Sequence, residues 1–308
     1  MLRKITASLI VIVFATVYLM NPSFASVNQD LYGRVIILDA GHGEENPNVW
    51  EDYFEHIRML DLAFMLKPLL EARGAEVFLT RADAHDVPHA VRCSMINNLA
   101  LGTLRDAGQG DIRELDRLMG VMQRVIDDPE QYAEIYYNTP FDYTYEREIH
   151  PDLERIFGLQ ADPLVSDRFL IISLHSNATP KPIDTSRNGV DIYYMSNDLE
   201  RNMNYYANYS SVRKSFYFAR LLMDDIGRLG LERQEIKDYY YFMLREHNLP
   251  AVLVENGFHT NDEDRAKLMD DVFLSRLATV YAEAVLYYFA SMSAIPERTN
   301  FDDIFGRL

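Results

Sequence analysis

Val35-Ile-Ile-Leu-Asp-Ala-Gly-His42-Gly43 is the stretch that decides the fold, because it is a hydrophobic run that leads directly into a histidine. Two further runs have the same form, Leu170-Ile-Ile-Ser-Leu-His175 and Pro250-Ala-Val-Leu-Val-Glu255. Short apolar runs of this kind are typical of strands buried in a parallel sheet. Side chains at the carboxyl ends of such strands converge on one edge, so we expect these three residues to share a site. Two imidazoles and a nearby carboxylate form a ligand set for Zn²⁺.

Together with the sequence that follows it, the first run indicates a strand, a helix and a second strand. From Glu55 to Arg73 the apolar residues recur near helical spacing, and Pro68 is expected to kink this helix. Gly74 ends the helix, and the residues from Ala75 to Thr80 form the next expected strand. A unit of this order predicts a parallel sheet with a right-handed crossover.

Similar patterns continue to the end of the chain. Strands are expected over residues 169–174, 189–195, about 239–244 and 251–255, and helices over 88–100, about 210–229 and 272–290. The predicted fold class is therefore α/β, with a mostly parallel, twisted sheet of about six strands and helices on both faces.

Residues 99–167 differ from this pattern and predict a helical insertion. The segment is charged and rich in tyrosine, and its apolar residues recur with mainly helical periodicity. Two interpretations stay open. The helices bury their apolar stripe in local packing, or they form a cap over the site, in which a carboxylate such as Glu134 or the tyrosines reach the cleft.

The first 25 residues have the layout of a secretory signal peptide. Arg3 and Lys4 precede an apolar run from Ala7 to Met20, and the pattern Ser23-Phe24-Ala25 predicts cleavage after Ala25. The alternative is an uncleaved membrane anchor, although the apolar run is shorter than a typical span. Either way we expect an exported protein of the periplasm or cell envelope.

Charge and cysteine content exclude some classes of partner and some means of stabilisation. The chain of 308 residues has a net charge of −17, and loss of Arg3 and Lys4 with the leader would make it −19. A field of this sign disfavours nucleic acid and anionic membrane surfaces. Cys93 is the single cysteine, so no internal disulfide can form and the core must stabilise the fold.

Taken in order, three motifs resemble the zinc-dependent N-acetylmuramoyl-L-alanine amidases, in the family whose first strand ends in Asp-Ala-Gly-His-Gly. They are Ile37-Leu-Asp-Ala-Gly-His42-Gly, Ser173-Leu-His175-Ser-Asn-Ala178 and Leu249-Pro-Ala-Val-Leu-Val-Glu255-Asn-Gly-Phe-His-Thr-Asn261. The match covers essentially residues 33 to 290, apart from the insertion. One departure is the segment Gly43-Glu-Glu-Asn-Pro-Asn-Val-Trp50, which replaces the usual glycine-rich continuation.

This resemblance implies that His42, Glu55 and His175 hold Zn²⁺, with a water in the open fourth position. Glu55 is favoured because it precedes Leu60-Asp-Leu-Ala, which aligns with the helix of the family, and Glu51 is the alternative. The start of a helix also favours a carboxylate.

The resemblance further implies that Glu255 takes a proton from the attacking water and passes it to the departing amine. Asp39 is either an acceptor that orients an imidazole or a plain strand-end carboxylate. The other histidines are expected mostly at the surface; they are His56, His85, His89, His150, His247 and His259.

The implied function is a peptidoglycan hydrolase that cleaves the amide bond between N-acetylmuramic acid and L-alanine, with residues 26–308 as its zinc amidase catalytic domain. Two alternatives stay open, since a fold alone does not fix function. One is a zinc peptidase or amidase that acts on another cell-wall peptide, and the other is a non-catalytic peptidoglycan-binding module. The expected partner is peptidoglycan, with an activator or division-complex protein left open and membrane contact expected only if the leader is uncleaved.

Overall fold

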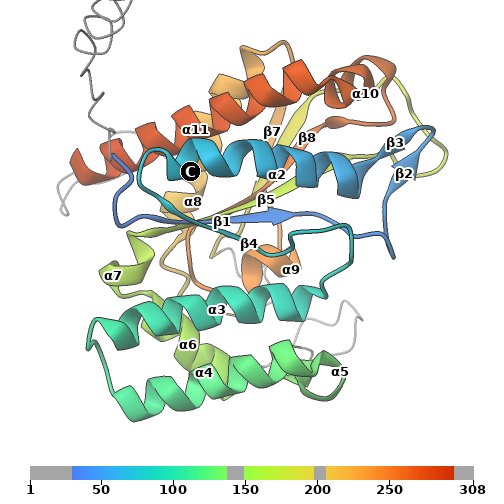
Figure 1. Ribbon diagram of the computed structural model, residues 1–308. Coiled ribbons are helices and arrows are strands. Elements are labelled where there is room, and N and C mark those ends of the chain that lie inside the picture. Colours follow the sequence, from blue (N-terminus) through green and yellow to red (C-terminus); the bar gives the residue numbers. More distant parts are fainter. Residues whose placement is uncertain (1–29, 137–148, 198–205, 295–308) are drawn as a thin grey trace, which may run out of the picture.

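The computed structural model describes residues 30–136, 149–197 and 206–294, so the expected leader lies outside the described residues. A six-stranded sheet in the order β4-β1-β5-β8-β6-β7 forms the centre of the fold (Figure 1). Its strands are β1 (Val35–Ala40), β4 (Glu76–Leu79), β5 (Phe169–Asn177), β6 (Val190–Tyr194), β7 (Arg233–Asp238) and β8 (Ala251–Phe258). All neighbours pair in parallel except β6 and β8, which are antiparallel. The predicted mostly parallel sheet is confirmed.

Helices cover both faces of the sheet, as expected. Ile36 and Leu38 of β1 pack into one apolar cluster with α2 (Glu55–Glu71), α8 (Val212–Gly227) and α11 (Asp271–Ala294). Val35 and Ile37 point the opposite way, toward α3 (His89–Asp106) and α9 (Phe242–Arg245). The alternation of side chains along each strand therefore buries both faces. α11 is long and apolar enough to cross a membrane, but it packs as a core helix with α2 and α8.

The helices of the expected insertion form an additional layer below α3 (Figure 1). They are α4 (Ile112–Asp127), α5 (Pro129–Tyr132), the 3₁₀ helix η1 (Ala133–Tyr136) and α6 (Pro151–Gln160), followed by α7 (Pro163–Ser166). The apolar stripe of α4 is buried in the same cluster as Leu101 and Leu104 of α3, which continues to Asp106. Local packing therefore accounts for this stripe.

The prediction of a strand near residues 239–244 is wrong. β7 ends at Asp238, and residues 242–245 form α9 instead. The aromatic run from Tyr239 to Phe242 has strand propensity, whereas β7 has the charged sequence Arg-Gln-Glu-Ile-Lys-Asp. β7 is an edge strand, and edge strands tolerate charge because one of their sides faces solvent.

Two short strands and one helix complete the site side of the molecule. β2 (Val49–Trp50) and β3 (Tyr53–Phe54) pair as a small antiparallel hairpin immediately before α2. α10 (Asp262–Met269) follows β8. In Figure 1 this hairpin and α10 lie near each other, beyond the carboxyl ends of β1 and β5.

Candidate metal centre

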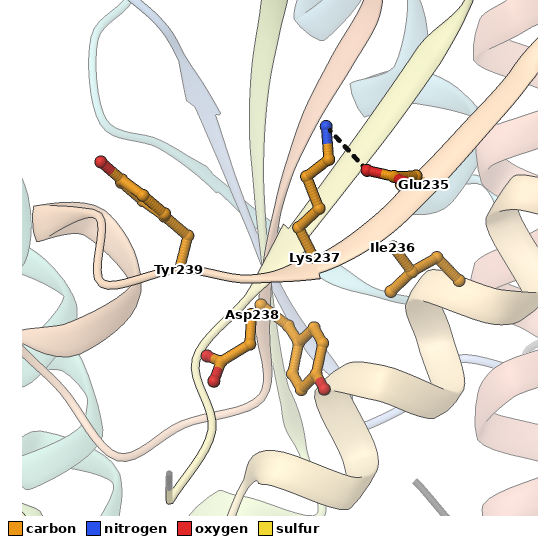
Figure 2. A pocket seen from close by; sticks show the side chains of 6 residues that line it. Glu235, Ile236, Lys237, Asp238 and Tyr239 are labelled. Atoms are coloured by element: carbon orange, nitrogen blue, oxygen red, sulfur yellow. Dashed lines mark ion pairs between the residues drawn. The ribbon is translucent and has the colours of Figure 1, made fainter. Parts of the chain in front are cut away.

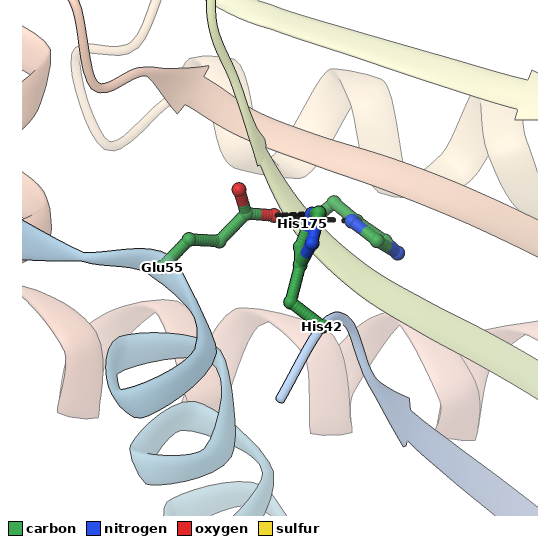
Figure 3. A group of neighbouring side chains, drawn as sticks. All are labelled: His42, Glu55 and His175. Atoms are coloured by element: carbon green, nitrogen blue, oxygen red, sulfur yellow. Dashed lines mark hydrogen bonds and ion pairs between the residues drawn. The ribbon is translucent and has the colours of Figure 1, made fainter. Parts of the chain in front are cut away.

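His42, Glu55 and His175 meet at the carboxyl edge of the sheet (Figure 3). One ligand atom from each lies within 4.8 Å of the others. Oε1 of Glu55 lies 3.0 Å from Nδ1 of His175 and 3.4 Å from Nε2 of His42. The predicted set therefore converges on one point from the loop after β1, the first residue of α2 and the end of β5.

The electrostatics of this cluster suit a cation. Glu55 is fully buried, and burial alone would raise its pKa, but hydrogen bonds with the imidazoles of His175 and His42 hold the pKa below its ordinary value. Burial would likewise lower the pKa of His175, whereas its hydrogen bond to Glu55 raises it. A buried carboxylate with two nitrogen ligands matches the donor chemistry of a catalytic Zn²⁺ site with three protein ligands. The residues present therefore fit the implied metal.

Gly41 and the backbone of His42 set the distance between the two histidines. A Cβ atom on Gly41 would lie 2.2 Å from Cε1 of His175, so only glycine leaves room for that ring. His42 itself has a φ of 61°, in the left-handed region that non-glycine residues rarely adopt. Strain of this kind persists only where surrounding contacts hold the backbone in place.

Two buried arginines supply these contacts. Arg81 donates to the carbonyl oxygens of Ala40 and Gly41 at 2.8 and 2.9 Å. Arg92 donates to the carbonyls of Ala40 and His42 at 2.7 and 2.8 Å. Arg92 is not among the residues that the sequence indicated. Its only signal is a charged residue on the otherwise apolar stretch Ala90-Val-Arg-Cys93 of α3.

Asp39 is a buried strand-end carboxylate, and its hydrogen bonds go to hydroxyls and a guanidinium rather than to an imidazole. Thr80 and Ser173 each donate to it at 2.6 Å, and Arg92 donates at 3.0 Å. Burial opposes its ionisation, but Arg92 and the two hydroxyls hold its pKa well below the ordinary range. Asp39 therefore anchors the arginine that supports the His42 loop.

Glu255 lies beside the three ligands but outside their group. It pairs in register with His175 across β5 and β8, and with Asp191 across β6 and β8. Its Oε2 is buried and has no hydrogen-bond partner among the described residues. Burial raises the pKa of Glu255 to about 8, helped by the negative charges of Glu55 and Asp191 and opposed by His175 and Lys237. A carboxyl group with a pKa near neutrality can both accept and donate a proton.

The alternative ligand Glu51 is not in the cluster. Its side chain is exposed and pairs with Arg265 of α10 at 2.5 Å. The left-handed backbone at Glu51, with a φ of 54°, belongs to the turn between β2 and β3. Glu55 rather than Glu51 therefore reaches the histidines.

The surface expectation is wrong for three of the other histidines, because His56, His247 and His259 are buried. His259 contacts Oγ of Ser176 through Nδ1 at 3.0 Å and stacks on Tyr53 at 5.0 Å between ring centroids. The imidazole of His247 is bonded to the main chain at both nitrogens, to Met243 and Leu249. These partners are distant in sequence or belong to irregular segments, so no periodicity indicates them.

A separate hollow of about 540 Å³ lies along the edge strand β7 (Figure 2). Lys237 is one of its lining residues and pairs with Glu235 at 3.4 Å and with buried Asp191 at 2.8 Å. None of the three clustered ligands lines it. The metal cluster and this hollow are therefore distinct, because β6 and β7 run antiparallel to β8 and their carboxyl ends lie at the opposite edge of the sheet.

Comparison with known proteins identifies proteins that are similar to this chain in sequence and in fold. A family model for N-acetylmuramoyl-L-alanine amidase matches residues 36–103 and 163–287, on either side of the added helices. The N-acetylmuramoyl-L-alanine amidase AmiC of Escherichia coli O6:H1 is 21% identical over 268 residues, which are 86% of this chain and 55% of the relative. The chain spans about half the length of the curated relatives it matches.

Two solved structures share the fold. The amidase Ami1 from Mycobacterium smegmatis aligns with a TM-score of 0.54 at 15% identity, over 85% of this chain and 99% of that one. The CwlD amidase from Clostridioides difficile, solved in complex with the GerS lipoprotein, aligns with a TM-score of 0.51 at 17% identity, over 84% and 99%. At these identities the alignments establish a common fold.

Proposed function

Because the chain belongs to the N-acetylmuramoyl-L-alanine amidase family, we propose that it is a zinc-dependent peptidoglycan hydrolase. Its reaction would cleave the amide bond between the lactyl group of N-acetylmuramic acid and L-alanine of the stem peptide. The observation that carries this proposal is the convergence of His42, Glu55 and His175 beside a buried carboxyl oxygen of Glu255 that has no partner among the described residues.

His42, Glu55 and His175 would hold the metal. When bound there, Zn²⁺ supplies Lewis acidity, which acidifies a water and polarises a carbonyl oxygen. Glu255 would accept the proton of the attacking water and then deliver it to the nitrogen of the departing L-alanine. Its raised pKa supports this dual role, because the group neither holds a proton too tightly nor releases it too readily near neutral pH.

Substitution of Glu255 separates proton transfer from metal binding. Glu255→Gln should keep its zinc and lose about 10² to 10⁴-fold of turnover, the usual contribution of general acid-base catalysis. Zinc content and stem-peptide release from purified peptidoglycan are the measurements, and His175→Ala, which should lose the metal, is the matched comparison. Full turnover in Glu255→Gln contradicts the role, and loss of zinc would make Glu255 a ligand.

The products distinguish the amidase from the two alternatives. Mass spectrometry of digested peptidoglycan should show free L-alanine amino termini and intact glycan, and a chelator should abolish their release. Cleavage within the peptide would favour a zinc peptidase. Retention on peptidoglycan without any product or bound zinc would favour a binding module.

Export and partner binding extend the same proposal. We propose residues 1–25 as the leader and residues 26–308 as the catalytic domain, with the inserted helices at about 99–167. A periplasmic or cell-envelope location would place the enzyme beside its polymer. The complex of the CwlD amidase with the GerS lipoprotein supports a search for a protein partner of this chain, such as an activator.

A further inference from the structure

The two oxygens of Glu55 have different environments. Oε1 faces the histidines and also accepts a hydrogen bond from the main-chain N–H of Ser176 at 2.9 Å. Oε2 accepts a hydrogen bond from the side-chain amide of Asn48. The main chains of the two residues are also bonded, and here Glu55 is the donor: its N–H donates to the carbonyl oxygen of Asn48 at 3.2 Å. Asn48 therefore holds Glu55 by both its side chain and its backbone.

The backbone around Asn48 is suited to this task. Asn48 has a φ of 46°, a left-handed conformation that asparagine tolerates better than most residues. It immediately precedes β2, and the hairpin of β2 and β3 is tied to α10 through Glu51 and Arg265. The side-chain amide of Asn48 therefore lies next to a hairpin that the ion pair with α10 holds in place. It belongs to the segment that departs from the usual glycine-rich sequence.

We propose that Asn48 is a positioning residue that makes Glu55 bind the metal through Oε1 alone. A carboxylate can bind a cation through one oxygen or through both. Zn²⁺ with three protein ligands keeps its fourth position for water, and a second carboxylate oxygen would compete for that position. By holding Oε2 away, Asn48 keeps the position open. This inference rests on the metal-dependent reaction proposed above.

The chemistry of the amide explains why asparagine serves here. Its N–H₂ group is a neutral donor, so it satisfies Oε2 without neutralising the charge that Glu55 offers to the metal. Aspartate has nearly the same shape but no donor, and its carboxylate would lie against Oε2 and repel it. Outer partners that orient metal ligands typically contribute 10 to 100-fold in metal affinity.

The test uses the purified full chain, stripped of metal and titrated with Zn²⁺ against a competing chelator. Asn48→Gly removes the amide while keeping the backbone free of strain at a φ of 46°, and Asn48→Asp keeps shape and backbone but removes the donor. Both should bind zinc about 10 to 100-fold more weakly. Asn46→Gly, at an exposed position two residues earlier, is the control and should bind zinc like the wild type.

Co²⁺ substitution supplies a readout that a purely structural role would not change, because its visible spectrum reports coordination geometry. The wild type should show the intense bands of a four-coordinate ion, and both Asn48 variants the weaker bands of higher coordination. Equal zinc affinity, or weaker affinity with an unchanged cobalt spectrum, would overturn the role of Asn48. A wild type that binds no zinc would overturn the proposed function as well, so the two failures are distinguishable.

Discussion

At the scale of single residues, the site depends on the absence of a Cβ atom at one glycine as much as on its ligands. Gly41 lets the ring of His175 lie against the backbone, and a methyl group there would lie 2.2 Å from Cε1. We expect Gly41→Ala to displace His175 and to weaken zinc binding by more than the roughly 10 to 100-fold typical of a lost outer partner. Metal content after dialysis is the measurement.

Gly120→Ala is the matched control for this substitution. A Cβ at Gly120 meets nothing within 4 Å, and alanine is the better helix former inside α4. It should leave zinc content unchanged. Stoichiometric zinc in Gly41→Ala would show that the ring of His175 can move away from the added methyl group and still bind the metal, and it would refute the steric argument.

Sequence alone indicated His42, His175 and Glu255 because each follows an apolar strand run, and the structure brings them to one edge of the sheet. It did not indicate Arg92, Asn48 or His259. Their contacts join different elements of the fold, as Arg92 does with Asp39 and His259 with Ser176, and such contacts leave no period in the sequence. Residues that carry the chemistry were thus easier to recognise than those that hold them in place.

At the scale of elements, Tyr136 joins the inserted helices to the rest of the fold. Its hydroxyl is buried against Oγ of Ser94 at 3.0 Å and Nδ2 of Asn97 at 3.1 Å, both on α3. Glu134, two residues earlier, is exposed and lies outside the metal-ligand group. The described part of the insertion is therefore held on α3 by packing and by this buried hydroxyl.

Tyr136→Phe should destabilise the protein by about 1 to 3 kcal/mol, because it removes the hydroxyl that pairs with Ser94 and with one N–H of Asn97 in the buried interface. Urea unfolding measures the change. Tyr132→Phe is the control, since the ring of Tyr132 is exposed and keeps its contact with Arg124. Equal stability of the two variants would show that the hydroxyl of Tyr136 contributes nothing to docking.

At the scale of the whole molecule, the segment after α9 links the inserted helices to the central sheet. Asn248 N–H donates to Oε1 of Gln160 at 2.7 Å, and its side-chain amide donates to the carbonyl of Phe157 at 2.9 Å. Asn97 of α3 donates to the carbonyl of Glu246 at 3.0 Å. These bonds are buried, so disruption of this segment should loosen both layers together.

His247 lies at the centre of this segment and makes its stability depend on pH. The buried ring donates from Nε2 to the carbonyl of Met243 at 2.9 Å, and Nδ1 accepts from Leu249 N–H at 3.3 Å. Both nitrogens are thus used by the neutral form. Burial lowers the pKa of His247 to about 4, although the Met243 carbonyl and the charge of Asp39 oppose this shift.

The sign of the effect follows from proton binding. Below about pH 6.5, the ordinary pKa of histidine, His247 binds a proton in the unfolded chain but stays neutral in the folded chain. The free energy of unfolding therefore falls as the pH falls toward 4. One pKa unit corresponds to about 1.36 kcal/mol, so the free energy of unfolding of the wild type should fall by about 2 kcal/mol between pH 7 and pH 5 through this group. The glutamine of His247→Gln does not titrate, so that variant should not show this loss. Urea unfolding of the metal-free proteins at both pH values measures this difference, and the exposed His85→Gln should follow the wild type. If the wild type and His247→Gln lost the same free energy of unfolding between pH 7 and pH 5, protonation of His247 could not be the cause of the pH dependence, and the prediction would be wrong.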